Sequence, residues 1–139
     1  MKCEDIKELL PQRAPILMVD KLLEVNGEEA QTSFTIHSGN FFLNEEGLLE
    51  VSGLIEHIAQ SASAFAGYMV RLTGAAEPPM GYIGEVKNFQ CHHRPQVGDE
   101  LHTNIRLGPE VEGVMLLSGE THIGEKIVAE TLMKIYLRS

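Results

Sequence analysis

The chain has few cysteines and few basic residues, and each shortage narrows the function it can have. Its two cysteines, Cys3 and Cys91, are too few for a disulfide framework, which favours a reducing compartment. Only 11 lysines and arginines stand against 20 aspartates and glutamates, so the net charge is −9. This charge argues against binding to nucleic acids or anionic membranes. No apolar run is long enough to span a bilayer, and residues 1–5 do not resemble a signal peptide. We therefore expect a cytoplasmic protein with no membrane span and no nucleic-acid partner.

The rest of the composition is that of an ordinary globular protein. Of the 139 residues, 43% are hydrophobic and 22% are charged, which suits a single domain over residues 1–139. Periodicity and turn signals predict, in chain order, a helix over Lys2–Leu10, strands over Ile16–Val25 and Ala30–His37, a loop over Ser38–Gly47, a helix over Leu48–Leu72, and strands over Gly81–Gln90, Glu100–Leu107, Val114–His122 and Lys126–Leu137. The tight connections between the last strands indicate a mainly antiparallel sheet, so the fold class is α+β.

The long helix is apolar over most of its circumference. Apolar residues recur along it at spacings of three and four, which is the helical period. They are Leu48, Val51, Ile55, Ile58, Ala62, Phe65 and Met69. Small residues between positions 59 and 67 keep the helix slim, which allows a strongly curved sheet to approach it. We therefore expect a curved sheet wrapped around one central helix.

One carboxylate, Glu56, interrupts this apolar surface. Glutamate is almost never fully buried unless it is paired or used in chemistry. Two interpretations follow. Either Glu56 lies on a narrow solvated stripe of the helix, or it is held in a cleft where it acts on a substrate.

Three segments resemble one known family, the hotdog-fold β-hydroxyacyl carrier-protein dehydratases. Residues 10–20, Leu-Pro-Gln-Arg-Ala-Pro-Ile-Leu-Met-Val-Asp, are similar to the family's Leu-Pro-His-Arg-x-Pro-x-Leu-x-Val-Asp. Residues 55–60, Ile-Glu-His-Ile-Ala-Gln, resemble its Glu-Ala-Met-Ala-Gln helix motif, and residues 89–101 resemble its Phe-x-x-Pro-Val-x-Pro-Gly-Asp segment. The resemblance implies a hotdog fold and a dimer whose two sheets join, with acyl sites at the interface between the helices.

The family dehydrates a 3-hydroxyacyl thioester on a phosphopantetheine arm. A base removes the proton α to the thioester carbonyl, and an acid protonates the departing hydroxyl group. In the family a loop histidine of one subunit is the base, and a helix carboxylate of the other, whose position Glu56 matches, handles the hydroxyl. The resemblance places Ser52 and Gly53 near the helix N–H groups that face the thioester oxygen. It places Gln60 one turn after Glu56, where it would orient the carboxylate.

The loop before the helix departs from the family pattern. The family has Gly-His-Phe-Pro-x-x-Pro-x-x-Pro-Gly there, whereas residues 39–51 contain neither histidine nor proline. Asn40 or Phe42 falls near the histidine position, and neither can act as a base. Gln12 also replaces the histidine of the opening motif. The base is therefore missing from its expected place.

Three explanations address the missing base. In the first, another histidine serves; His37 is favoured, because His57 points roughly 100° around the helix from Glu56. In the second, this chain donates Glu56 and a related partner subunit donates the histidine. Dehydratase-like proteins of aryl-polyene pathways are the most similar in this respect, with a degenerate loop and a retained helix glutamate. In the third, the protein is an acyl thioesterase in which Glu56 activates water.

The other motifs predict neither a metal nor a cofactor. Cys91-His92-His93 has no second ligand pair at a typical spacing, and Gly81-Tyr82-Ile83-Gly84 lacks the features of a phosphate loop. Because carrier proteins are typically acidic, docking on this acidic chain needs a local basic patch. The candidates are Arg13, Arg71, Lys87, Arg94 and Lys134.

These observations predict a 3-hydroxyacyl-[acyl-carrier-protein] dehydratase-like protein of fatty-acid or polyene biosynthesis, which is a carbon–oxygen lyase. The candidate catalytic residues are Glu56 and His37. The candidate substrate-binding residues are Ser52, Gly53 and Gln60. The expected assembly is a homodimer or a heterodimer with a related hotdog subunit. The alternatives are an acyl thioesterase that uses the helix carboxylate and a non-catalytic acyl-binding subunit.

Overall fold

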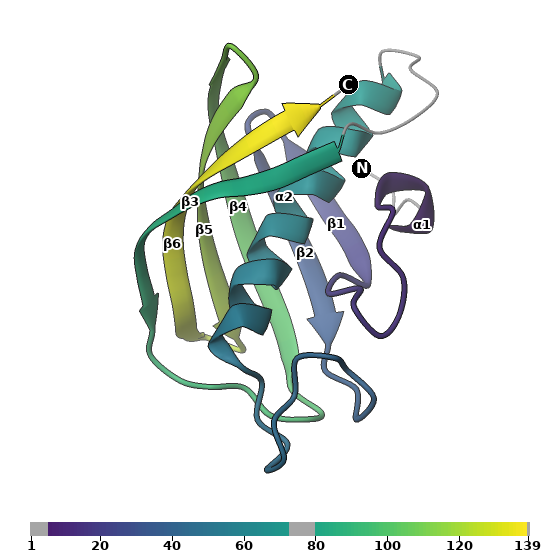
Figure 1. Cartoon of the computed structure of the whole chain (residues 1–139), viewed down its shortest axis with the longest axis vertical. Coiled ribbons are helices and arrows are strands. Elements are labelled where there is room, and N and C mark those ends of the chain that lie inside the picture. The colour runs from purple at the N-terminus through teal and green to yellow at the C-terminus, as the bar shows by residue number, and fades with distance from the viewer. Residues whose placement is uncertain (1–5, 73–79, 139) are drawn as a thin grey trace.

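Six strands form one antiparallel sheet that curves around a long helix (Figure 1). The computed structural model describes residues 6–72 and 80–138. Its elements are α1 (Ile6–Leu9), β1 (Lys21–Asn26), β2 (Glu29–Thr35), α2 (Val51–Leu72), β3 (Met80–Cys91), β4 (Glu100–Val111), β5 (Val114–Ile123) and β6 (Lys126–Arg138). The strand order is β1-β2-β4-β5-β6-β3, and every neighbouring pair is antiparallel. The predicted α+β architecture, a mainly antiparallel sheet around one helix, is confirmed.

The core lies between α2 and the inner face of the sheet. Side chains alternate along β4, so Leu101 and Ile105 are buried whereas Arg106 is exposed. On β5, Gly119 faces the helix, and a Cβ added there would lie 2.5 Å from Cγ2 of Ile58. A side chain at position 119 would therefore push α2 away from the sheet.

The strand β3 forms one edge of the sheet. It pairs with β6 on one side, and within the described residues no strand pairs with its other side. An edge strand carries unpaired N–H and C=O groups, to which a strand of a second chain can pair. The sheet can therefore be extended at β3, next to the face that carries α2.

The strand β1 begins at Lys21, five residues later than the predicted start at Ile16. The main chain of Met18 is hydrogen-bonded by side chains of α2 instead of by a neighbouring strand. The prediction that residues 16–20 belong to a strand is therefore wrong, although Met18 and Val19 in this run are buried.

The helix α2 begins at Val51, three residues later than predicted. Leu48 and Leu49 instead form isolated bridges with Gln96 and Leu43. Residues 2–5 of the predicted first helix, which include Cys3, lie outside the described residues. Across residues 6–72 and 80–138, no helix is long and apolar enough to cross a membrane.

Candidate functional site

Glu56 lies in the second turn of α2 and is half-buried. Its Oε2 accepts a hydrogen bond from Nε2 of Gln60 at 3.4 Å. Burial raises the pKa of Glu56 above its usual value, and the hydrogen bond from Gln60 offsets part of that rise. Within the described residues Glu56 takes part in no ion pair. A carboxyl group with a raised pKa keeps its proton closer to neutral pH, so it is suited to donate one.

Gln60 is buried and joins Glu56 to the segment before β1. Its Oε1 accepts a hydrogen bond from the N–H of Met18 at 2.7 Å. Its Nε2 donates to the carbonyl oxygen of Ile16 at 3.1 Å as well as to Glu56. Because a main-chain N–H can only donate, these contacts fix the orientation of the amide. The structure thus brings Gln60 and Glu56 together.

His57 follows Glu56 in sequence but points into the core. Its side chain is fully buried, with Nδ1 2.6 Å from the carbonyl oxygen of Met18 and Nε2 2.7 Å from Oγ1 of Thr103. The hydroxyl of Thr103 is in turn 2.7 Å from that of Thr121. Burial lowers the pKa of His57 to about 4. A neutral imidazole with both nitrogens occupied in the core is not available to a substrate as a base.

His37 lies just after β2 and is exposed. Its ring packs edge-on against Phe34, with the ring centroids 6.4 Å apart. Within the described residues no hydrogen bond joins His37 to Glu56. One copy of the chain therefore does not assemble a His37–Glu56 pair.

The loop before α2 is attached to the Met18 segment through Asn40, one of the two residues that fall near the position of the family's histidine. Nδ2 of Asn40 lies 3.1 Å from the sulfur of Met18, and Oδ1 accepts a hydrogen bond from the N–H of Phe42 at 2.8 Å. Phe42 packs edge-on against the exposed Phe41, with ring centroids 5.1 Å apart. Both residues near the position of the missing base therefore make structural contacts, and neither can act as a base.

Ser52 and Gly53 lie in the first turn of α2 and differ in what their N–H groups can bind. The N–H of Gly53 donates to the carbonyl oxygen of Glu50 at 2.9 Å, so it is already used. Ser52 is exposed, and the described residues provide no main-chain acceptor for its N–H. This is expected, because the first N–H groups of a helix lack intrahelical acceptors. Of the two, Ser52 is the one with an N–H left for a ligand.

The five basic residues considered for carrier-protein docking do not converge on one patch. Arg71 lies in the last turn of α2, and Arg94 lies beside the first turn at the other end. Four of them pair with glutamates: Arg71 with Glu8 at 3.7 Å, Lys87 and Lys134 with Glu85 at 3.9 and 3.4 Å, and Arg94 with Glu50 at 3.5 Å. Arg13 donates to main-chain carbonyl oxygens, including that of Leu10 at 2.7 Å.

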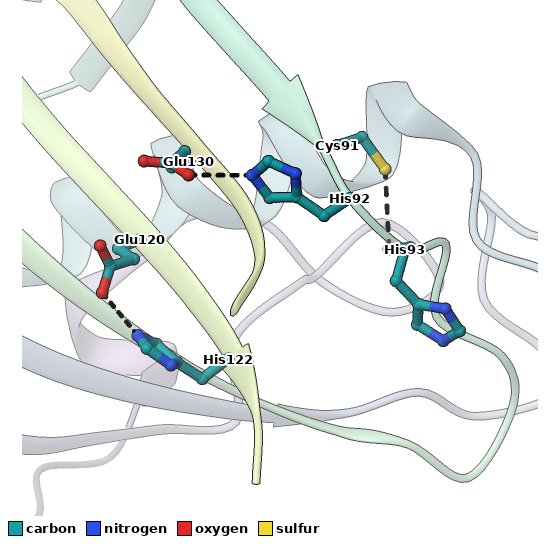
Figure 2. Close-up of polar contacts among 6 residues, drawn as sticks. All are labelled: Cys91, His92, His93, Glu120, His122 and Glu130. Carbon is teal, nitrogen blue, oxygen red and sulfur yellow. Dashed lines mark hydrogen bonds and ion pairs between the residues drawn. The ribbon is translucent and has the colours of Figure 1, made fainter. Parts of the chain in front are cut away.

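The run Cys91-His92-His93 lies at the end of β3, and its side chains diverge (Figure 2). The sulfur of Cys91 is 3.6 Å from the carbonyl oxygen of His93, and Nε2 of His92 is 2.9 Å from Oε2 of Glu130 on β6. The ring of His93 points away from both. In the part of the chain that the structure describes, no group of three or more His, Cys, Asp or Glu residues is placed to hold a metal ion. The run instead ties β3 to β6.

Sequence reasoning missed Met18, which holds the site together through its main chain. It also missed Arg94 as a helix-start residue: Nε donates to the carbonyl oxygen of Leu49 at 3.0 Å, directly before α2. For Met18 the sequence contains no signal, because its hydrogen bonds depend on main-chain atoms that every residue has. For Arg94, the neighbouring Pro95 and Gly98 indicate a loop, but they do not indicate that its side chain bonds to Leu49.

Comparison with known proteins identifies the family. The family model of the ApeP dehydratases, described as ApeP-like, matches residues 4–138. The 3-hydroxyacyl-[acyl-carrier-protein] dehydratase FabZ of Oenococcus oeni is 36% identical over 112 residues, covering 77% of this chain and 78% of that protein. FabZ of Bartonella quintana is 26% identical over 132 residues, covering 91% and 83%.

Solved structures agree on the fold. The dehydratase heterocomplex ApeI:P from Xenorhabdus doucetiae matches with a TM-score of 0.89 at 18% identity, covering 98% of this chain and 92% of that chain. The PaaI protein of Escherichia coli matches with a TM-score of 0.62 at 11% identity, covering 83% and 80%. These likenesses show the hotdog fold. With its family model matched from residue 4 to residue 138, the chain belongs to the ApeP-like dehydratase family.

Proposed function

We propose that this chain supplies Glu56 as the acid for dehydration of 3-hydroxyacyl groups on an acyl carrier protein, in a site completed by a histidine-bearing hotdog partner. The observation that carries the proposal is the environment of Glu56. The carboxyl group is half-buried, its pKa is raised by burial, and Gln60 holds it in place. We place this carbon–oxygen lyase activity in fatty-acid or polyene biosynthesis and in the cytoplasm, with residues 1–139 as one hotdog domain.

The proposed reaction balances with one base and one acid. The base takes the proton from the carbon α to the thioester carbonyl, and the electron pair of that C–H bond forms the new double bond. The C–O bond to the β-hydroxyl group breaks, and Glu56 donates its proton to the departing oxygen, which leaves as water. Glu56 is left as a carboxylate and the base is left protonated. Before the next turnover the base releases its proton and Glu56 regains one, so the net change is the loss of one water.

The start of α2 is suited to the negative charge that develops on the thioester oxygen. Within the described residues the N–H of Ser52 has no main-chain acceptor, and the helix dipole is positive at this end. Donors fixed before the reaction stabilise a developing charge without having to reorganise. We assign this role to the N–H of Ser52, whereas Gly53 serves to let the loop pack on the helix.

A partner chain is the source of the base that we favour. His57 is neutral and buried, and His37 packs against Phe34 without contacting Glu56. The related ApeI:P assembly is a dehydratase heterocomplex. The edge strand β3 provides a place where a second hotdog sheet can join, which would bring the partner's loop toward α2.

The thioesterase alternative needs Glu56 in the opposite protonation state. A carboxyl group that activates water must be ionised before it accepts the proton, and burial of Glu56 disfavours the ionised form. The environment of Glu56 therefore favours the acid of a dehydration over the base of a hydrolysis.

The test is an assay with a 3-hydroxyacyl carrier-protein substrate, with the chain alone and with a histidine-bearing relative from the same organism. Enoyl product is expected only when both chains are present, and Glu56→Gln in the mixture should slow its formation by about 10²–10⁴-fold. Release of free thiol without enoyl product would instead identify a thioesterase. Full activity of Glu56→Gln would exclude the proposed role of this residue.

The variant His37→Gln separates the two sources of the base. If the partner supplies the histidine, this change leaves turnover by the mixture nearly unaltered. If the chain alone forms enoyl product and His37→Gln abolishes it, the base is His37 of a second copy of this chain.

A further inference from the structure

Met18 is held on three sides by side chains from α2 and from the loop before it. It is fully buried, its N–H donates to Gln60 and its carbonyl oxygen accepts from His57. Its sulfur contacts the amide of Asn40 at 3.1 Å. Both main-chain contacts come from residues of α2 that follow Glu56, at one and four positions after it.

The chemistry of these groups gives every hydrogen bond in the network a direction. A carbonyl oxygen only accepts, so Nδ1 of His57 carries the hydrogen and donates to Met18. In the neutral ring Nε2 is then an acceptor, so the hydroxyl of Thr103 donates to it. The hydroxyl of Thr103 has no second hydrogen, so the hydroxyl of Thr121 donates to Thr103. The chain of hydrogen bonds thus runs from β5 through β4 and His57 to Met18.

The hydrogen bonds between Met18 and Glu56 have fixed directions as well. The N–H of Met18 requires the oxygen of the Gln60 amide, which leaves the amide nitrogen facing Ile16 and Glu56. If the amide rotated, the buried N–H of Met18 would lose its acceptor, which is unfavourable. Oε2 of Glu56 therefore faces a donor, and a proton on Glu56 is best accommodated on the other oxygen, Oε1.

We propose that His57 is a positioning residue that acts through the main chain of Met18 to lock Gln60, so that Glu56 carries its acidic proton on Oε1. The catalytic consequence rests on the proposed function of Glu56, whereas the positioning itself does not. His57 holds the carbonyl group of Met18 on one side of its α-carbon, and Gln60 holds the N–H on the other. Loss of the first contact frees the Met18 main chain to turn, and the second contact then weakens.

In residues 6–72 and 80–138, no ion pair includes His57. Within the described residues its polar contacts are Met18 and Thr103, and its ring lies 6.1 Å from that of Phe34, measured between centroids. Glu56, the preceding residue, has its hydrogen bond with Gln60. The network is therefore one of neutral hydrogen bonds that ends on a single carboxyl group.

The first experiment measures the pKa of Glu56 in the purified full chain by carbon-detected NMR titration, with Glu56→Gln to assign the signal. His57→Leu removes both hydrogen bonds of the ring, whereas His57→Asn retains an N–H that can donate to Met18. Because the Gln60 bond lowers the pKa of Glu56, His57→Leu should raise that pKa, and His57→Asn should return it toward the wild-type value.

The matched control is Ser61→Ala. Ser61 is buried on the same helix and forms a 2.7 Å hydrogen bond with Thr32, so its loss also removes a buried polar contact. The pKa of Glu56 should not change in this variant. Equal shifts in Ser61→Ala and His57→Leu, or no shift in either, would overturn the proposal, because His57 would then act only as part of the core.

If His57→Leu does not fold, Thr103→Val provides the second route. This change leaves the imidazole in place but removes the hydroxyl that donates to Nε2, so the ring is held less firmly. A smaller rise in the pKa of Glu56 is expected. A well-folded Thr103→Val with an unchanged Glu56 would contradict a network that extends to β4.

The second experiment measures turnover in the complex with the histidine-bearing partner. His57→Leu should lower kcat by about tenfold or more with KM nearly unchanged, since the acid is misplaced while the acyl chain still binds. His57→Asn should recover most of the loss. If the pKa of Glu56 responds as expected but Glu56→Gln keeps full turnover, the proposed function fails and the positioning role stands.

Discussion

Gly53 of α2 lies directly against Phe42 of the preceding loop. A Cβ built on Gly53 would be 2.7 Å from Cβ of Phe42 and 3.0 Å from the side chain of Leu49. The glycine at the start of the helix is therefore a point of close packing, and its N–H is already bonded to Glu50. The same loop carries Asn40, so its position affects the Met18 segment as well.

Replacement of Gly53 by alanine should displace this loop. We expect the free energy of unfolding to fall by about 1–3 kcal/mol, the usual cost of overpacking, although alanine is the better helix former. Urea denaturation measures the change. The matched control is Gly39→Ala, because an added Cβ there meets no atom within 4 Å. Equal stability of the two variants would contradict the close contact.

Glu56→Gln should lower turnover by the complex by about 10²–10⁴-fold, the range for loss of a general acid.

The same change should increase the stability of the folded chain at neutral pH. Burial raises the pKa of Glu56 in the folded chain, so its contribution is favourable below pH 4.5 and is lost as the pH rises through the raised pKa. Thermal unfolding at pH 4 and pH 7.5 checks this, with a gain only at the higher pH.

We expect His57 to lower the stability of the wild-type chain in weak acid. Its pKa drops from 6.5 in the unfolded chain to about 4 in the folded one, so its contribution is present above pH 6.5 and is lost as the pH falls through 4. The full change corresponds to about 3 kcal/mol. Urea denaturation between pH 7 and pH 4 measures it. His57→Asn removes the titrating group, and parallel pH curves for both proteins would count against this origin.

Arg94→Lys should weaken the start of α2. The guanidinium group donates to the carbonyl oxygen of Leu49 and lies 3.5 Å from Glu50, and a lysine cannot reproduce this fork. We expect a loss of about 1 kcal/mol in the free energy of unfolding. Lys134→Met, which breaks the surface pair with Glu85, is the control and should change stability by less than about 0.5 kcal/mol.

Most of the architecture could be predicted because it follows from local patterns. The spacing of apolar residues located α2, and the turns at Gly98, Gly113 and Gly124 separated the last strands. The predicted start of β1 is wrong because an apolar run has the same pattern in both cases. Its main-chain hydrogen bonds can be made by a neighbouring strand or by side chains of a helix. Periodicity reports burial and says nothing about which group accepts each hydrogen bond.

The candidate site was only partly accessible to sequence reasoning. Glu56 and Gln60 could be paired because residues four apart share a helix face. The roles of His57 and Thr103 could not be predicted, because 46 positions separate them and only the three-dimensional packing brings them together. The family resemblance placed Gly53 near the helix N–H groups that face the substrate. Its close contact with Phe42 could not be predicted, because it depends on the path of the loop.

The dependence of the site on the main chain of Met18 affects how variation among relatives should be interpreted. Its N–H and carbonyl oxygen would be present in any residue but proline, which lacks the N–H, so leucine or isoleucine could occupy position 18 with both main-chain contacts intact. A position that supports the acid can therefore vary among apolar side chains that fit the core, although only methionine keeps the sulfur contact with Asn40. Scores based on residue identity would miss the contribution of its main chain, whereas a scan that replaces each residue by proline would reveal it.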